Sequence, residues 1–235
     1  MSNTYFQFKQ FRIEQDRCAM KVGTDGVLLG SWASVNETNS ILDIGTGTGL
    51  IALMLAQRSN ATINAIEINK EAFNQSYENI SNSKWNSRIK VHNCSFQDFY
   101  KTQINKFDLI VSNPPYFKNS LKPKENDRVQ ARHNIDLSSD ELLLGVKKLL
   151  NENGCFCIIL PALENDSFIL EAEQYNLFCS KIVYVKPTLN KDTKRIMLEF
   201  VFGKVNRIED SFAIETDKRH CYTEEYKNLT KDFYL

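Results

Sequence analysis

The sequence predicts an α/β fold, with a doubly wound, mostly parallel sheet of seven strands in which the last strand is antiparallel. Two observations lead to this fold class. Short apolar runs alternate with segments of helical pattern, as in parallel sheets covered by helices on both faces. The last two apolar runs, 178–186 and 194–203, are too close together for a crossover helix, so they must pair antiparallel.

The N-terminal region, residues 1–38, is expected to lie outside the sheet. Aromatic side chains alternate within residues 4–14, which is typical of a strand or a hairpin arm. Residues 25–34 have the pattern of a short helix. We therefore expect an N-terminal arm and a short helix that lie over the ligand site described below.

Seven short segments are predicted to be the strands of the core, residues 39–205. They are residues 40–44, 62–67, 89–93, 107–112, 155–160, 178–186 and 194–203. Helical patterns lie at residues 49–58, 70–82 and 138–150. A polar loop at 117–137 precedes the last helix, and Asn153–Gly154 is a typical helix-end signal. Residues 206–235 are polar and aromatic, and we expect a tail packed on the core.

Composition and charge exclude some classes of protein. The chain has 235 residues, of which 42% are hydrophobic and 25% charged, as in an ordinary globular domain. Lys plus Arg and Asp plus Glu each number 29, so nucleic acid could be bound only by local basic patches. The N-terminus lacks the pattern of a signal peptide, and no apolar run has membrane-spanning length. We expect a cytoplasmic monomer with no membrane partner.

The cysteines do not indicate a metal site. There are six, and none forms a C-x-x-C pair. Cys155 and Cys157 lie within an apolar run that is predicted to be a strand. We therefore expect reduced and mostly buried thiols, and no metal.

A glycine-rich segment follows the first predicted strand of the sheet and leads into a helix. Its pattern is D-x-G-x-G-x-G. Glycines let the backbone turn tightly and approach a ligand closely, and the start of the helix offers free N–H groups. At the end of the next strand, an acid can accept hydrogen bonds from both hydroxyls of a ribose. The candidate cofactor-binding residues are Asp43, Gly45, Gly47, Gly49 and Glu67.

The spacing of these glycines distinguishes two kinds of cofactor site. A dinucleotide site has G-x-G-x-x-G, whereas this segment has G-x-G-x-G with Asp43 before the first glycine. A carboxylate is poorly placed beside a pyrophosphate and well placed near a cationic sulfonium or ammonium group. The segment therefore resembles the cofactor loop of S-adenosylmethionine-dependent methyltransferases. A glycine turn that binds nothing is the alternative, and the position of Glu67 argues against it.

An Asn-Pro-Pro-Tyr segment follows the fourth predicted strand, at the sheet edge where ligands bind in open α/β folds. The side-chain oxygen of Asn113 and the carbonyl of Pro114 can accept both hydrogens of an exocyclic amine, which frees a lone pair otherwise delocalised into the ring. Prolines stiffen the turn, and a tyrosine can stack on a base. Methyl transfer then needs positioning and dipoles rather than a strong base. The candidate catalytic residues are Asn113, Pro114, Pro115 and Tyr116.

Together the glycine loop, Glu67 and Asn-Pro-Pro-Tyr resemble amino-directed class I methyltransferases. Further segments are similar to the bacterial tRNA1(Val) adenine-N6 methyltransferases, which act on the adenine just 3′ of the anticodon, position 37. These segments are K-V-G-T-D-G-V-L-L-G at 21–30, A-R-H at 131–133, and the tail residues 222–226, 229–230 and 233–235. The resemblance covers nearly the whole chain.

The resemblance implies S-adenosylmethionine as the cofactor, a tRNA as the substrate and N6 of adenine as the target atom. It places residues 21–25 at the methionine end of the cofactor and an acid after the third strand at its adenine amine. From the residues alone, 21–25 could equally be a glycine turn with Thr24 or Asp25 as a helix N-cap. The cofactor contacts that the resemblance adds are Lys21, Gly23, Thr24, Ile68, Asp98, Phe99 and Asn113.

Basic residues are concentrated in the loop that follows Asn-Pro-Pro-Tyr. Beside a target pocket, such a group can grip RNA phosphates. A second basic stretch lies on the final hairpin, at Lys186, Lys191, Lys194 and Arg195. Any single one of these residues is more simply a solvated surface charge, so the prediction depends on the grouping. The candidate substrate-binding residues are Lys118, Lys122, Lys124, Arg128, Arg132 and His133.

Three other functions remain open. A glutamine side-chain amide also has a delocalised nitrogen, so a protein glutamine methyltransferase could use the same motif. Such enzymes usually carry an additional N-terminal helical domain, whereas residues 1–38 look strand-like. Methylation of guanine N2 in ribosomal RNA is the second alternative. A non-catalytic module that binds the cofactor or RNA is the third, and the intact Asn113 and glycine loop argue against it.

Overall fold

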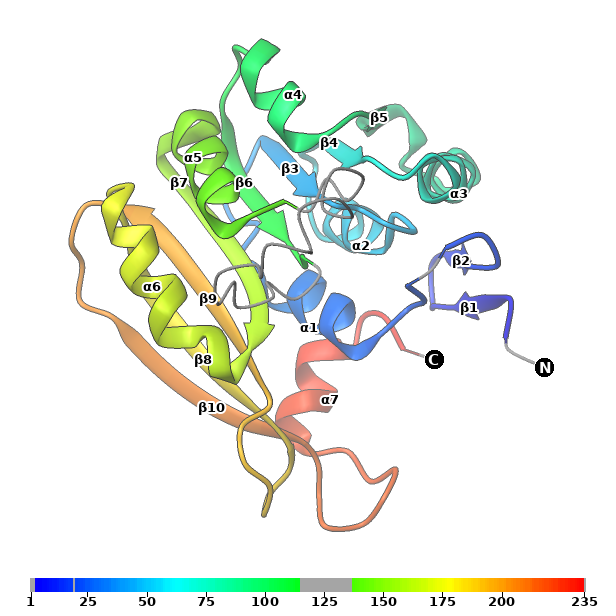
Figure 1. Cartoon of the computed structure of the whole chain (residues 1–235). Helices are drawn as coiled ribbons and strands as arrows, with labels where there is room; N and C mark the ends of the chain where they lie inside the picture. The colour runs from blue at the N-terminus through cyan, green and yellow to red at the C-terminus, as the bar shows by residue number, and fades with distance from the viewer. Residues whose placement is uncertain (1–2, 19, 115–136, 235) are drawn as a thin grey trace, which may run out of the picture.

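Eight strands form the central sheet of the computed structural model, which describes residues 3–18, 20–114 and 137–234 (Figure 1). Their order across the sheet is β10-β8-β9-β7-β6-β3-β4-β5. The strands are β3 (Ser40–Ile44), β4 (Thr62–Glu67), β5 (Ile89–Asn93), β6 (Phe107–Ser112), β7 (Leu150–Pro161), β8 (Leu177–Thr188), β9 (Arg195–Phe202) and β10 (Ile208–Glu215). Only β9 runs antiparallel to its neighbours in this sheet, which confirms the predicted mostly parallel fold with an antiparallel hairpin.

The order of the strands places a topological switch point between β3 and β6. From β3 the chain moves outward through β4 to β5, and then returns to pair β6 with the other side of β3. The helices that follow β3 and β6 therefore turn to opposite faces. In open α/β sheets the crevice at such a point, outside the carboxyl ends of the strands, is where ligands bind.

Helices cover both faces of the sheet, and each face has its own apolar core (Figure 1). One core involves α1 (Thr24–Trp32), α2 (Leu50–Arg58), α3 (Lys70–Ser81) and α7 (Glu224–Thr230). The other involves α4 (Phe96–Thr102), α5 (Ser139–Leu149) and α6 (Asn165–Gln174). Short 3₁₀ turns lie at Asn86–Arg88 and Ala162–Glu164. Among the described residues, no helix is both long enough and apolar enough to span a membrane.

The sheet has one strand more than the seven that we predicted. Residues 208–215, which we assigned to the tail, form β10 and pair in parallel with β8. The prediction missed this strand because it lies at the edge of the sheet and its first four residues are exposed. Its apolar side chains are therefore too few to stand out from a polar tail.

The strand after α5 also begins earlier than predicted, at Leu150 rather than at residue 155. Gly154 does not end a helix but lies inside β7, against β6. A Cβ atom at Gly154 would be only 2.9 Å from the carbonyl oxygen of Asp108. This glycine is therefore needed for close approach between the two strands.

The N-terminal arm is a hairpin of β1 (Tyr5–Gln7) and β2 (Arg12–Glu14), as the alternating aromatics predicted. Phe8 and Ile13 are fully buried in the core on the α2 face. The side chain of Asn79, in α3, holds this arm: it accepts from the Glu14 N–H and donates to the carbonyls of Glu14 and Thr48, each at 2.9 Å. One amide therefore joins the arm, α3 and the end of the glycine loop.

Candidate active site

Two adjoining cavities open at the carboxyl ends of the central strands. The first has a volume of about 310 Å³ and lies over the ends of β3, β4 and β6. The second has a volume of about 480 Å³ and lies between the glycine loop and the start of α1. Both are lined by Met20, Gly45, Gly47, Asn113 and Pro114, so they are two parts of one cleft.

The glycine loop turns from β3 into α2 through left-handed backbone. Gly45, Gly47 and Gly49 have φ values of 73°, 57° and 84°, which favour glycine. A Cβ atom at Gly45 or Gly47 would have no neighbour within 4 Å, so bare backbone faces the cleft there. Gly49 does not line either cavity, and its role is to start α2 beside Ile80.

Glu67 ends β4, and its side chain is only 8% exposed. One carboxylate oxygen accepts from the Gly47 N–H at 2.9 Å, and the other accepts from the Asn69 N–H at 2.8 Å. Each carboxylate oxygen can accept a second hydrogen bond. Glu67 lines the first cavity, so two fixed acceptor sites suit the two hydroxyls of a ribose.

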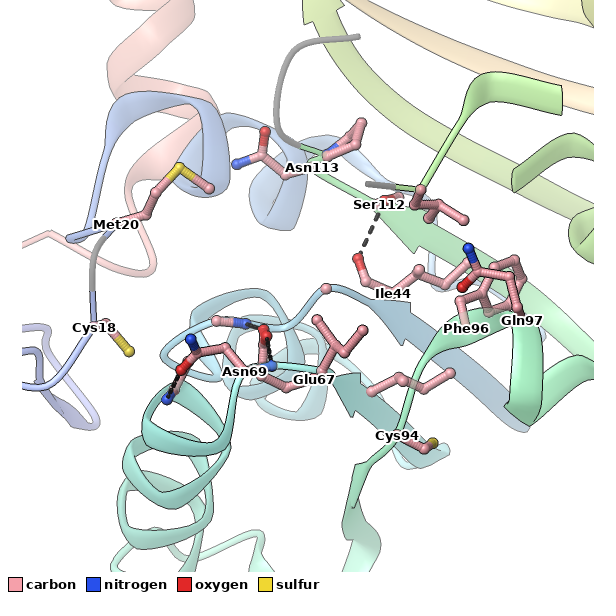
Figure 2. Close-up of a pocket in the computed structure, with 17 residues that line it drawn as sticks. Cys18, Met20, Ile44, Glu67, Asn69, Cys94, Phe96, Gln97, Ser112 and Asn113 are labelled. Carbon is pink, nitrogen blue, oxygen red and sulfur yellow. Dashed lines mark hydrogen bonds between the residues drawn. The ribbon is translucent and has the colours of Figure 1, made fainter. Parts of the chain in front are cut away.

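Asn113 and Pro114 lie where the two cavities meet. They follow β6, whose last residue, Ser112, donates a hydroxyl hydrogen bond of 3.1 Å to the Ile44 carbonyl of β3. This bond joins the two strands at the switch point. Figure 2 shows Asn113 and Met20 along one side of the hollow, with Glu67 and Asn69 along the other. A ligand held by Glu67 would therefore have its opposite face toward Asn113.

The segment from Lys21 to Asp25, which we expect at the methionine end of the cofactor, forms one wall of the second cavity. The N-cap of α1 is Gly23, without a side-chain hydrogen bond, so neither Thr24 nor Asp25 is the N-cap. The Asp25 carboxylate instead accepts from Nε of Arg195 at 2.7 Å. Arg195, which we had grouped with RNA-binding residues, thus lines the cleft.

Comparison with known proteins identifies the family. The model of a protein family described as "Methyltransferase small domain" matches residues 21–171. Two relatives are each 48% identical over all of this chain and 99% of their own length. They are the tRNA1(Val) (adenine(37)-N6)-methyltransferases of Christiangramia forsetii and Bacteroides fragilis. The chain belongs to the methyltransferase small domain family.

Solved structures of methyltransferases share this fold. A predicted O-methyltransferase from Agrobacterium tumefaciens aligns with a TM-score of 0.72 at 16% identity, over 89% of this chain and 96% of that one. A ribosomal protein L11 methylase from Lactobacillus delbrueckii aligns with a TM-score of 0.59 at 16% identity, over 82% and 84%. The class I methyltransferase fold of this family member is therefore confirmed.

Asp43 is not exposed to the cleft in this methyltransferase small domain. Its side chain is fully buried under the glycine loop, where it accepts from the Thr46 hydroxyl at 2.6 Å. Burial raises the pKa of the Asp43 carboxyl to about 7, although the Thr46 hydroxyl and the Ala52 N–H favour the carboxylate. Asp43 therefore supports the loop from behind, and its position does not match the expected contact with a cationic group.

Asp98 and Phe99 are also not among the residues that line the cleft. Asp98 is the third residue of α4, and its carboxylate accepts from the Ser95 hydroxyl at 2.7 Å beside a separate hollow. The residue before it, Gln97, lines the first cavity instead, together with Phe96. Successive side chains on a helix are rotated by about 100° around its axis. Gln97 can therefore face the cavity while its neighbour Asp98 faces away from it.

The wall of the first cavity includes one residue that we predicted from the sequence and two that we did not predict. Ile68 was predicted, and it is 47% exposed beside Glu67, so a flat ring could pack on it. Met20 is 61% exposed and lines both cavities, but no sequence signal marked it. Cys18 also lines the first cavity, and burial and Glu67 raise the pKa of its thiol to about 11. This thiol stays protonated and is a poor nucleophile.

Two of the predicted catalytic residues and all six predicted substrate contacts fall on the segment 115–136. Pro115 and Tyr116 lie outside the described residues. The same holds for the basic loop residues Lys118, Lys122, Lys124, Arg128, Arg132 and His133. The described part of the predicted site is therefore the cofactor side and the start of the target loop.

Among the residues that the structure describes, one cluster of possible metal ligands lies away from the cleft. The Sγ atoms of Cys155 and Cys157 and a carboxylate oxygen of Glu199 are within 4.8 Å of one another, on β7 and β9. The neighbouring Cys155 thiol and burial raise the pKa of Cys157 well above its usual value. The Cys157 thiol is therefore protonated at neutral pH in the metal-free protein.

Proposed function

We propose that this protein transfers a methyl group from S-adenosylmethionine to N6 of adenine 37 in tRNA1(Val). The observation that carries the proposal is the position of Asn113 and Pro114 at the junction of the two cavities. There, an amine-polarising pair faces the place where a cofactor and a base would meet. Relatives with 48% identity over the whole chain, which bear the name tRNA1(Val) (adenine(37)-N6)-methyltransferase, support this substrate.

The residues present fit S-adenosylmethionine, which when bound supplies an electrophilic methyl group on a sulfonium. Glu67 offers two acceptor sites for the ribose hydroxyls, and the exposed Ile68 offers a surface for the adenine ring. The Gln97 amide donates to Glu141 at 3.1 Å, which leaves its oxygen as the acceptor for an adenine amine. We infer that Gln97, rather than Asp98, accepts a hydrogen bond from this amine.

The second cavity has the charges that an amino acid group requires. Asp25 can accept from an ammonium, and Lys21 and Arg195 can attract a carboxylate. The bare backbone of Gly45 and Gly47 lies between this cavity and the first one, so the middle of the cofactor can pass close to the loop. The order of these groups along the cleft therefore matches the order of chemical groups in S-adenosylmethionine.

Asn113 and Pro114 carry out the activation of the target amine. The side-chain oxygen of Asn113 and the carbonyl of Pro114 accept its two hydrogens, so the nitrogen lone pair is no longer held in the ring. As the new N–C bond forms, the methyl group's bond to sulfur breaks and the nitrogen becomes acidic. Water can then take the extra proton, so the step depends on positioning and dipoles rather than on a strong base.

A methyl-transfer assay with labelled S-adenosylmethionine tests the proposal. A tRNA1(Val) transcript with adenine at position 37, the same transcript with guanine there, and total cell protein are offered separately. We expect label only in the adenine transcript, recovered as N6-methyladenosine. Label in protein would favour the glutamine methyltransferase alternative, and label in the guanine transcript would show that adenine 37 is not the target.

A further inference from the structure

Two surface loops bring exposed positive charge to the carboxyl edge of the sheet. One is the β8–β9 hairpin loop, and the other connects β10 to α7. We call their cations, with the lysine near the end of β8, the basic rim. The basic rim consists of Lys186, Lys191, Lys194, Lys218 and Arg219.

Strand direction places the basic rim on the same edge as the cleft. β7 runs parallel to β6, β9 is antiparallel to both β7 and β8, and β10 is parallel to β8. The carboxyl ends of β6, β7, β8 and β10 therefore share one edge (Figure 1). Lys194 is followed directly by Arg195, which lines the cleft, so the rim continues the cleft wall.

The two loops have defined conformations and are joined to each other. The Asn190 side-chain amide donates to the Asp217 carboxylate at 2.7 Å, which links the hairpin loop to the β10–α7 loop. The Lys194 N–H donates to the Val185 carbonyl at 3.0 Å, and the Thr216 N–H donates to the Cys221 carbonyl at 2.7 Å. The positive charges are thus held on a fixed framework.

The charges of the basic rim are available to an anion. Within the part of the chain that the structure describes, none of the five forms an ion pair with a carboxylate. Asp217, one of the two acids in these loops, is occupied by Asn190. The chain as a whole has no net charge, so other parts of the protein carry the negative charge that balances the basic rim. Such a local patch is what a neutral protein needs to hold a polyanion.

We propose that the basic rim binds the phosphate backbone of the RNA substrate outside the target nucleotide. This inference rests on the proposed function. An RNA that delivers one base to Asn113 can continue along the edge of the sheet past Arg195, which lines the same cavity and directly follows Lys194 of the rim. Contacts to phosphate fix position without reading sequence, so the rim sets affinity and orientation rather than the choice of base.

The test is a fourfold variant, Lys191→Gln, Lys194→Gln, Lys218→Gln and Arg219→Gln, with a control of two lysines on the opposite edge. The control is Lys106→Gln with Lys204→Gln, which lie before β6 and after the antiparallel β9. Binding of tRNA1(Val) is measured across a salt series. Because each phosphate contact contributes about 0.7–0.9 to the slope of log affinity against log salt, we expect the fourfold variant to have a clearly shallower slope.

At moderate salt, we expect tRNA affinity to fall at least about tenfold in the rim variant and to stay at the wild-type value in the control. The KM for tRNA should rise, while kcat and affinity for S-adenosylmethionine stay unchanged. If the wild type methylates tRNA and the rim variant has the wild-type affinity and salt slope, the proposed role of the basic rim is wrong and the proposed function stands. If the wild type neither binds nor methylates tRNA, the proposed role of the rim and the proposed function are both wrong.

Discussion

The backbone N–H of Gly47 donates a hydrogen bond of 2.9 Å to the carboxylate of Glu67. The two residues belong to different motifs, the loop after β3 and the end of β4, and parallel pairing of these strands brings them together. The bond fixes the carboxylate against the loop, while each oxygen keeps an acceptor site for a ligand. The conformation of the glycine loop and the ribose site are therefore one unit.

The first prediction concerns this unit. In Glu67→Gln, the new NH₂ group must face the N–H of Gly47 or of Asn69, so one of the two hydrogen bonds is lost. The same NH₂ group also removes an acceptor site for a ribose hydroxyl. Because a hydrogen bond to a charged group contributes about 1.5–3 kcal/mol, affinity for S-adenosylmethionine should fall by about one to two orders of magnitude. Calorimetric titration measures this, with Glu71→Gln on the exposed start of α3 as the control. Equal affinities for both variants would contradict the ribose role.

The second prediction concerns the partly buried pair of Asp25 and Arg195. Because each positions the other at the wall of the second cavity, Asp25→Ala and Arg195→Ala should weaken cofactor binding non-additively. For a pair with this exposure we expect a coupling free energy of about 0.5–1 kcal/mol. A double-mutant cycle on the dissociation constant measures it. Strictly additive effects would show that the ion pair does not organise the site.

The third prediction is a pH dependence that comes from Asp43. The pKa of its carboxyl is 3.8 when unperturbed and about 7 in the folded protein, because of burial. Between these values the folded state holds a proton that the unfolded state has released. The stability that Asp43 contributes is therefore complete below about pH 4 and is lost as pH rises through 7.

Urea unfolding of wild type and Asp43→Asn at pH 5 and pH 8 tests this dependence. The variant cannot ionise, so the wild type should lose about 2–3 kcal/mol of unfolding free energy relative to the variant between the two pH values. Comparing the two proteins removes the contributions of other titrating groups. A difference that does not change with pH would mean that Asp43 is ionised throughout.

The fourth prediction concerns Gly145 of α5, which packs on the wall of the first cavity. A Cβ atom there would lie 2.4 Å from a ring carbon of Phe96 and 2.6 Å from one of Tyr100. Alanine in a helix gains about 1 kcal/mol over glycine, but overpacking a core costs about 1–3 kcal/mol. We expect Gly145→Ala to be destabilising and to weaken cofactor binding, because Phe96 lines the cavity.

Thermal unfolding and cofactor titration measure both effects of Gly145→Ala. Lys147→Ala, on the exposed side of the same helix, is the control and should change neither property. A Gly145→Ala variant that is more stable than the wild type would show that the two rings move aside without cost.

Sequence reasoning succeeded where a motif directly follows a strand. The strands 62–67, 89–93 and 107–112 have the predicted bounds. Glu67 ends one of these strands and Asn113 directly follows another, so parallel pairing carries them to one edge. The local sequence pattern is enough to place these two residues, since the pairing of the strand backbones sets their positions.

Sequence reasoning failed where position depends on packing or on helix rotation. Arg195 reaches Asp25 across 170 residues of chain, and no local pattern predicts that contact. Gln97 rather than Asp98 faces the cleft because of where α4 begins. The edge strand β10 was missed because its exposed residues conceal the alternation of the buried ones.

The central claim is that Asn113 activates an adenine amine, and single-turnover methylation of a tRNA1(Val) transcript by wild type and Asn113→Ala tests it most directly. Removing one preorganised dipole from a transition state costs about 10²–10³ in rate. We predict a loss of this size for Asn113→Ala, with N6-methyladenosine at position 37 as the wild-type product and unchanged affinity for S-adenosylmethionine. A variant that methylates at nearly the wild-type rate would contradict the role of Asn113.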